Sequence, residues 1–273
     1  MAIITISRQL ATLSDETAHE LAKLLDYRFV DKQTLEERIK SYGVAPRKFE
    51  KYDECKPSFF ASLSQDRDDY LHFLKTAILT EAAEKSCVFI GRGACAVFKN
   101  VPGVLSVFLV APPEIRRERV KSYFHCDDKR ARQIIEQSDH NRAGFHQYFF
   151  DMDWRDAANY HLTINTGHLS PSLCARIIKD LRDHLIDEEA EAQNTLRLKE
   201  LIAAQQLVHH ILYEKEIPIH FLEAVVSNGT ATIYGVANSQ ALIEAAVSAA
   251  RDLPSFSEVC SKIQVVQEYS VMP

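Results

Sequence analysis

Short apolar runs alternate with longer amphipathic stretches over the first 185 residues. The apolar runs have the length and the β-rich composition of strands, and they lie at residues 2–7, 28–31, 87–90, 104–110 and 162–165. In the first stretch between them, Ala18, Leu21, Ala22 and Leu25 share one helical face. Short apolar strands that alternate with helices are typical of a parallel sheet covered on both faces. The pattern predicts an α/β domain over residues 1–185.

The segment between the second and third apolar runs, residues 32–86, is predicted to be mostly helical. Interruptions are expected around Gly43, Pro46 and Pro57, because glycine and proline weaken or end helices. The polar, arginine-rich stretch that follows the fourth run is also predicted to be helical, and a last helix is expected at residues 170–187.

A different pattern begins after residue 185. Residues 187–194 are acidic and lack an apolar stripe, so we interpret residues 186–197 as a solvated helical linker. Beyond it, Asn228-Gly229 separates two strand-like runs, which is a strong signal for a hairpin. Residues 198–273 are therefore predicted to form a small second α/β domain. Its strands are expected at 219–226, 230–234 and 259–265, and its helix at 239–253.

Composition and charge restrict the function. Apolar residues make up 46% of the 273 residues, which is typical of a globular protein. The net charge of −6 argues against a general nucleic-acid binder, because such proteins need clustered lysine and arginine. The six cysteines include no Cys-x-x-Cys pair, and the histidines lack partners at ligand spacing, so we predict no metal site.

The expected location follows by elimination. Residues 2–7 lack the basic region and the long apolar core of a signal peptide. No segment approaches the ~18 consecutive apolar residues that a membrane span needs. Scattered cysteines suit a reducing compartment. A cytoplasmic protein without a transmembrane segment is expected.

The turn after the first strand lies where P-loop proteins bind phosphate. A working loop needs glycines, so that backbone N–H groups can close around phosphate oxygens, and a lysine and a Ser or Thr for the phosphates and Mg²⁺. Here residues 7–16 read Ser-Arg-Gln-Leu-Ala-Thr-Leu-Ser-Asp-Glu, without glycine or lysine. Composition alone favours an ordinary strand-to-helix turn in which Ser14 caps the helix.

The stretch from Ile3 to Asp31 resembles the start of bacterial cytidylate kinases. It is more similar to the cytidylate-kinase-like family, whose loop typically reads Ser-Arg-Gln-Leu-Gly-Ser-Gly-Gly. This chain keeps the first four of these residues from Ser7 onwards, but residues 11–14 are Ala-Thr-Leu-Ser. On the alignment to cytidylate kinases Ser14 replaces the lysine, and Glu16 replaces the metal-side threonine. The resemblance covers residues 1–183 and implies a P-loop nucleoside monophosphate kinase fold.

The same resemblance implies an acceptor site. Residues 29–31 are similar to a Leu-Leu-Asp segment that faces the acceptor nucleoside monophosphate. Residues 90–93 are similar to a Gly-Arg-Asp motif, although the aspartate is missing, and residues 138–143 are similar to an Arg-Asp-x-Asn-Arg-Ala segment. The substrate-binding residues implied are Asp31, Arg92, Asp139 and Arg142.

The resemblance also implies catalytic and donor-side residues. Arg116 and Arg119 fall on an arginine-rich lid helix and would neutralise the transferring phosphoryl group. ATP and Mg²⁺ would be the cofactors of an active enzyme. The candidate residues for binding them are Ser7, Arg8, Thr12, Ser14 and Asn165.

Each candidate also has a simpler structural interpretation. Asp31 could cap the next helix, and Gly91-Arg92-Gly93 could be an ordinary turn at a strand end. Arg116 and Arg119 could form a solvated face that pairs with neighbouring glutamates. Asp139 and Arg142, three residues apart on a helix, could pair with each other.

The second domain, over residues 198–269, resembles a BON domain through its hairpin, its alanine-rich helix and its closing strand. In relatives this module is thought to bind lipids, other hydrophobic ligands or proteins, and a packing or dimerisation role stays open. Two functions therefore remain: phosphoryl transfer from ATP to a CMP-like nucleoside monophosphate, or a catalytically inactive module that binds a nucleotide or a partner.

Overall fold

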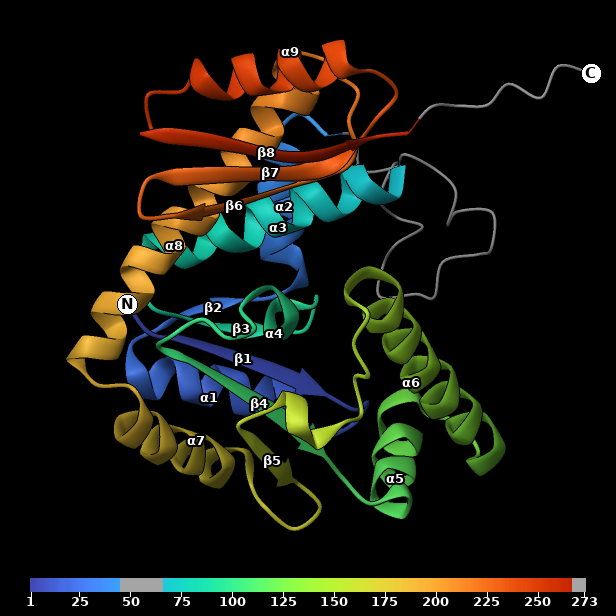
Figure 1. Ribbon diagram of the computed structural model, residues 1–273. Helices are drawn as coiled ribbons and strands as arrows, with labels where there is room; N and C mark the ends of the chain where they lie inside the picture. The colour runs from blue at the N-terminus through green and yellow to red at the C-terminus, as the bar shows by residue number, and fades with distance from the viewer. Residues whose placement is uncertain (45–65, 267–273) are drawn as a thin grey trace, which may run out of the picture. The chain divides into compact units, whose positions relative to one another are not determined.

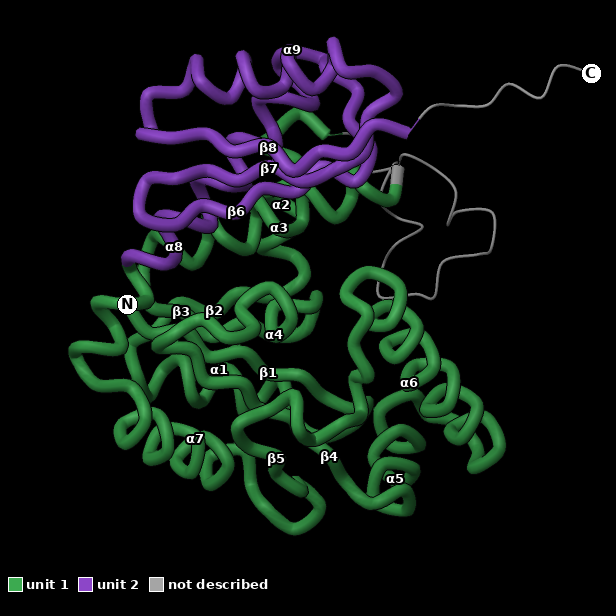
Figure 2. Tube along the Cα trace, in the orientation of Figure 1, with its two compact units in different colours: residues 1–195 green, residues 196–273 purple. Residues whose placement is uncertain are grey.

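The computed structural model describes residues 1–44 and 66–266, so the interruptions expected near Pro46 and Pro57 lie outside the described residues. The chain divides into two compact units, residues 1–195 and 196–273 (Figure 2). None of the helices within the described ranges combines the length and the hydropathy needed to span a bilayer.

The first unit contains a five-stranded parallel sheet with the strand order β2-β3-β1-β4-β5. Every apolar run singled out in the sequence forms one of these strands. Their bounds are Ile3–Arg8 for β1, Arg28–Val30 for β2, Cys87–Ile90 for β3, Val104–Val110 for β4 and Leu162–Asn165 for β5. The predicted α/β fold with a parallel sheet is confirmed.

Helices cover both faces of this sheet (Figure 1). Helices α1 and α7 lie on one face, and α3 and α4 lie on the other, while α5 and α6 follow the end of β4 as a helical pair. The bounds are Ser14–Leu25 for α1, Lys32–Ser41 for α2, Asp66–Glu84 for α3, Ala94–Val97 for α4, Pro113–Phe124 for α5, Asp128–Phe150 for α6, Pro171–Leu185 for α7 and Glu188–His209 for α8.

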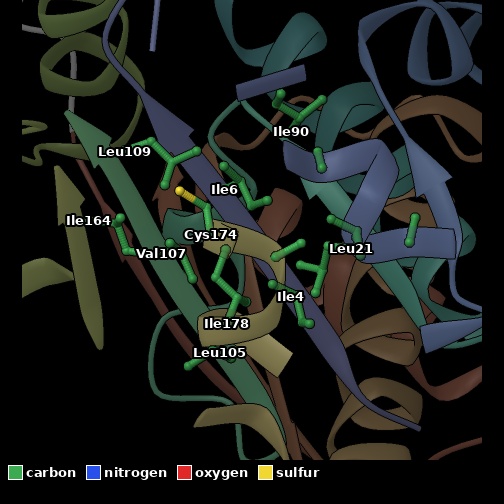
Figure 3. Close-up of a cluster of buried hydrophobic side chains, with 14 of the residues drawn as sticks. Ile4, Ile6, Leu21, Ile90, Leu105, Val107, Leu109, Ile164, Cys174 and Ile178 are labelled. Carbon is green, nitrogen blue, oxygen red and sulfur yellow. The ribbon is translucent and has the colours of Figure 1, made fainter. Parts of the chain in front are cut away.

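Alternating side chains of the central strands supply the cores on the two faces. Ile4 and Ile6 of β1 meet Leu21 of α1 and Ile178 of α7 in the main buried cluster (Figure 3). Beyond the other face of the sheet, Phe108 of β4 packs in a second cluster with Cys95, Met152, Trp154 and Tyr160. Because both faces are buried, the strands read as continuous apolar runs in the sequence.

The acidic stretch after residue 186 is helical, as expected, but it is not solvated along its whole length. Ile186 belongs to the main core of the first unit, and Asn194 is fully buried. The Asn194 side chain donates a hydrogen bond to the carbonyl of Pro102 at 2.6 Å. The first unit therefore extends through residue 195 and includes most of the expected linker.

The second unit contains a three-stranded sheet with the order β6-β7-β8. The strands β6 (His220–Ser227) and β7 (Thr230–Ala237) form the expected antiparallel hairpin, and β8 (Glu258–Val265) pairs with β7 in parallel. Asn228 and Gly229 have φ of 50° and 80°, as a two-residue hairpin turn requires. Helix α9 (Gln240–Arg251) follows, with Ser239 as its cap.

Candidate functional site

The loop between β1 and α1 adopts a backbone conformation that normally needs glycine. Ala11 and Leu13 have φ of 62° and 54°, in the left-handed region. Non-glycine residues rarely occupy this region, because the Cβ atom crowds the backbone. Both residues occupy positions where the resembling family has glycine. The loop has therefore lost the glycines but kept the backbone conformation that suits them.

Side chains on the loop and on the first turn of α1 bind two of the loop carbonyls. The Thr12 hydroxyl donates to the Gln9 carbonyl at 3.0 Å. The Leu13 carbonyl accepts hydrogen bonds from Thr17, at 3.0 Å from the backbone N–H and 2.7 Å from the hydroxyl. The first N–H groups of α1 follow this loop directly and have no acceptor within the helix. These amide donors at a helix N-terminus are suited to an anion.

The two predicted lid arginines bind two further loop carbonyls. The Arg116 Nε donates to the Leu10 carbonyl at 2.8 Å, and Arg119 Nη1 donates to the Ala11 carbonyl at 3.1 Å. Arg119 Nη2 also donates to the carbonyl of Thr166, just beyond β5, at 2.9 Å. Both guanidinium groups therefore contact the body of the protein and do not form a solvated face.

Arg116 also forms a buried ion pair with Asp139 of α6. Its Nη1 and Nη2 atoms donate to the two carboxylate oxygens at 2.9 and 2.8 Å. Arg116 is 5% exposed and Asp139 is 7% exposed. The sequence assigned these residues to different roles, one to the transferring phosphoryl group and one to the acceptor. The structure joins them, so the alternative that Asp139 pairs with Arg142 alone is wrong.

The expected helix cap is displaced by one residue. Leu13 is the N-cap of α1 and makes no side-chain capping bond, while Ser14 is the first helical residue. The Ser14 hydroxyl donates to the Asp15 carboxylate at 3.3 Å. Asp15 and Glu16 are exposed in the first turn of α1, so they place negative charge beside the loop amides.

On the predicted acceptor side, Asp31 caps α2. Its Oδ1 accepts hydrogen bonds from the Thr34 amide and hydroxyl, both at 2.9 Å, so the capping interpretation is confirmed. Arg92 is buried and donates to Glu36 of the same helix at 3.2 Å. Gly91, Arg92 and Gly93 all have φ between 55° and 73°, so this turn is more constrained than an ordinary strand end.

The remaining acceptor-side residue, Arg142, lies on α6 and donates to the Ser138 hydroxyl. Its backbone carbonyl accepts a hydrogen bond from Nδ1 of His146 at 2.9 Å. Asp31 and Arg92 bond to α2, and Arg142 bonds within α6. The structure gathers Arg116, Arg119 and Asp139 at the loop.

The donor-side candidates differ in their surroundings. Ser7 is buried near the end of β1, and its hydroxyl donates to the Cys95 thiol at 3.3 Å. Arg8 is the last residue of β1, and Thr12 is fully buried in the loop. The exposed Asn165 accepts a hydrogen bond from the Gly167 amide at 2.9 Å, which closes the turn after β5.

Sequence reasoning missed a buried polar cluster behind the loop. The Nε2 atom of His146 lies 4.0 Å from the Cys95 thiol, and the Tyr160 hydroxyl donates to the Trp154 carbonyl at 2.9 Å. Burial is the main reason that the pKa of Tyr160 is raised. Residues 95 and 146 lie far apart in the chain, so no local pattern could reveal this pair. Within the described ranges, no three His, Cys, Asp or Glu side chains are arranged to hold a metal ion.

Comparisons with known proteins agree with the two-unit organisation. Residues 3–168 match the sequence profile of the Cytidylate kinase-like family, and residues 200–267 match that of the BON domain. No curated protein gives a significant match to the chain.

Solved structures resemble the first unit. An uncharacterized protein from Eubacterium ventriosum ATCC 27560 matches with a TM-score of 0.55 and 20% identity, over 67% of this chain and 99% of that one. Shikimate kinase from Bacteroides thetaiotaomicron matches with a TM-score of 0.40 and 17% identity, over 67% and 98% of the two chains. At these identities the first likeness supports the fold alone.

Proposed function

The chain belongs to the cytidylate kinase-like family, and on this basis we propose that its first unit binds a nucleoside triphosphate without transferring the phosphoryl group efficiently. The observation that carries the proposal is the loop after β1. It combines a left-handed, glycine-type backbone at Ala11 and Leu13 with the first N–H groups of α1, which have no acceptor within the helix. That combination supports binding of a phosphate chain.

The loop side chains argue for weak binding. The Cβ atoms of residues 11–14 occupy space through which phosphate oxygens approach the backbone in a glycine loop. The exposed carboxylates of Asp15 and Glu16 repel an anion at the same helix end. We therefore expect ATP to bind in the high-micromolar range or more weakly.

The arginine contacts argue against efficient catalysis. Phosphoryl transfer depends on positioning and on cationic groups that neutralise the developing charge, with Mg²⁺ bridging the phosphates. The loop has no lysine, and Glu16 stands at the metal-side position of the resembling kinases. Arg116 is bound to Asp139 and to the Leu10 carbonyl, and Arg119 binds the Ala11 carbonyl. These two arginines therefore stabilise the protein's own structure.

If a nucleoside monophosphate also binds, we propose that Arg92 and Arg142 contact its phosphate. Each would contribute about 1.5–3 kcal/mol, the range for hydrogen bonds to charged groups. The BON unit is proposed to supply the second binding function, toward a hydrophobic ligand or a protein partner.

The test is calorimetric titration of the full chain with ATP, ADP and CMP, with and without Mg²⁺, together with an assay for ADP formation. Glu16→Thr removes a charge at the loop and should strengthen ATP binding several-fold. Glu20→Thr, an exposed substitution one turn further along α1, is the matched control and should leave binding unchanged. CMP-dependent ADP formation well above background would establish the alternative function as a kinase. Sub-micromolar ATP binding would refute the argument for weak binding.

A further inference from the structure

We propose that Arg119, assisted by Arg116, is a positioning residue that takes the place of the missing loop glycines. The two arginines hold residues 10 and 11 by their carbonyls and keep the loop in its left-handed form. The inference refines the proposed function, because it concerns how the same loop is held.

The loop needs such support because its backbone is strained. A left-handed conformation costs a non-glycine residue roughly 1–2 kcal/mol, and the loop contains two such residues with one residue between them. A strained conformation persists only where the surrounding structure fixes it. Leu13 is held by Thr17 within the first turn of α1. Ala11 has no such local partner among the described bonds, and its carbonyl is held by Arg119.

Arg119 links the loop to the segment that follows β5. Its guanidinium bridges the Ala11 carbonyl, at 3.1 Å, and the Thr166 carbonyl, at 2.9 Å. Thr166 is fully buried, and its amide donates to the Val110 carbonyl at 2.8 Å, so the second contact is fixed to the end of β4. A planar guanidinium can bind two carbonyls at once, whereas a lysine ammonium lacks this geometry.

Arg116 supports the neighbouring carbonyl in the same way. Its Nε binds Leu10, while Asp139 holds its two Nη atoms. The two arginines therefore connect helix α5 to consecutive peptide groups of the loop. Because glycine adopts the left-handed region without strain, a loop with glycines at positions 11 and 13 should no longer need Arg119.

The test measures amide hydrogen exchange in the full chain at the two hydrogen-bonded amides that flank the loop. The Gln9 amide donates to the Leu109 carbonyl at 3.0 Å, and the Thr17 amide donates to the Leu13 carbonyl at 3.0 Å. Their protection is taken as loop protection. Four proteins are compared: wild type, Arg119→Ala, Ala11→Gly with Leu13→Gly, and all three substitutions together. Arg119→Ala should lower the protection of these two amides by about tenfold or more, since a bond from a charged donor that fixes the loop is lost. The triple variant should recover protection to within about threefold of the glycine-only variant.

The matched control is Arg117→Ala on the same helix. Arg117 pairs with Asp128 of α6 at 3.0 Å, so its removal should leave loop exchange unchanged. Arg119→Lys should give an intermediate loss and provides a second variant if Arg119→Ala does not fold. Protection unaffected by both Arg119 substitutions, or an Arg119→Ala defect that the glycines do not relieve, would overturn the inference.

Binding of ATP to the same four proteins separates this inference from the proposed function. If the glycines restore both loop protection and ATP binding to Arg119→Ala, Arg119 acts through the loop. If loop protection is restored but binding is not, Arg119 contacts the phosphates directly, which contradicts a purely positioning role. If no protein binds ATP, the proposed function fails, while the exchange data still decide whether Arg119 holds the loop.

Discussion

The ion pair between Arg116 and Asp139 allows a quantitative test of the site. In Asp139→Ala the Arg116 guanidinium remains, but both hydrogen bonds that its Nη atoms donate to the carboxylate are lost. With Arg116 5% exposed, solvent cannot replace the lost carboxylate without rearrangement. Breaking a buried pair by removing one partner costs about 3–5 kcal/mol, because an uncompensated charge remains. We expect Asp139→Ala to lower the free energy of unfolding of the first unit by this amount.

The measurement is urea unfolding of the full chain, monitored through Trp154, which packs in the first unit. Asp128→Ala is the matched control, because Asp128 lies on the same helix and also pairs with arginines but is 43% exposed as a side chain. Surface pairs contribute about 1 kcal/mol or less, so the control should lose far less stability.

A double substitution, Arg116→Met with Asp139→Leu, examines the mechanism of the loss. Replacing both charges by apolar groups removes the unpaired cation, so part of the lost stability should return. The Leu10 carbonyl stays without its Arg116 donor, which limits the recovery. If Asp139→Ala were no more destabilising than Asp128→Ala, the pair would not be desolvated as described, and the argument from burial would fail.

Three further outcomes follow from other parts of the chain. Burial raises the pKa of the Cys87 thiol from 9.0 to about 12. The contribution of the neutral thiol to the stability of the folded state is complete below pH 9 and should be lost as the pH rises toward 12. In urea unfolding at about pH 10.5, wild type should therefore have lost about 2 kcal/mol relative to Cys87→Val. Gly93→Ala should lower the free energy of unfolding by about 2–4 kcal/mol in the same assay, because φ is 72° and the new Cβ would lie 2.3 Å from Phe150. Gly43→Ala is the control: φ is 79° and no described atom lies within 4 Å, so it should lower the free energy of unfolding by only about 1–2 kcal/mol. Fragments 1–195 and 196–273 should each unfold cooperatively in thermal scans; aggregation of the first, or a second fragment unfolded at every concentration, would show that the units share one core.

The strands and turns could be read from the sequence because their signals are local. A strand buried on both faces requires a continuous apolar run, and Cys87–Ile90 and Val104–Val110 form strands at the expected residues. The Asn228-Gly229 turn needs positive φ at two successive residues, which few other dipeptides supply. The helix expected at 239–253 forms as α9, over Gln240–Arg251.

The backbone conformation of the phosphate loop could not be predicted from local sequence signals. The absence of glycine at positions 11 and 13 predicts an ordinary turn, since propensity reports only the strain within the loop. The left-handed backbone is held by contacts from Arg119 and Arg116, more than 100 residues away in the chain. A local propensity contains no information about such partners.

The partners of the charged residues were likewise decided by the tertiary structure. Asp139 and Arg142 are correctly spaced to pair along a helix, yet Asp139 binds Arg116 of another helix. Asn194 reads as part of a solvated acidic helix, yet it is buried against the carbonyl of Pro102. Spacing along the chain determines which residues can share a helical face, whereas burial and charge pairing depend on which elements meet when the sheet and its helices pack together.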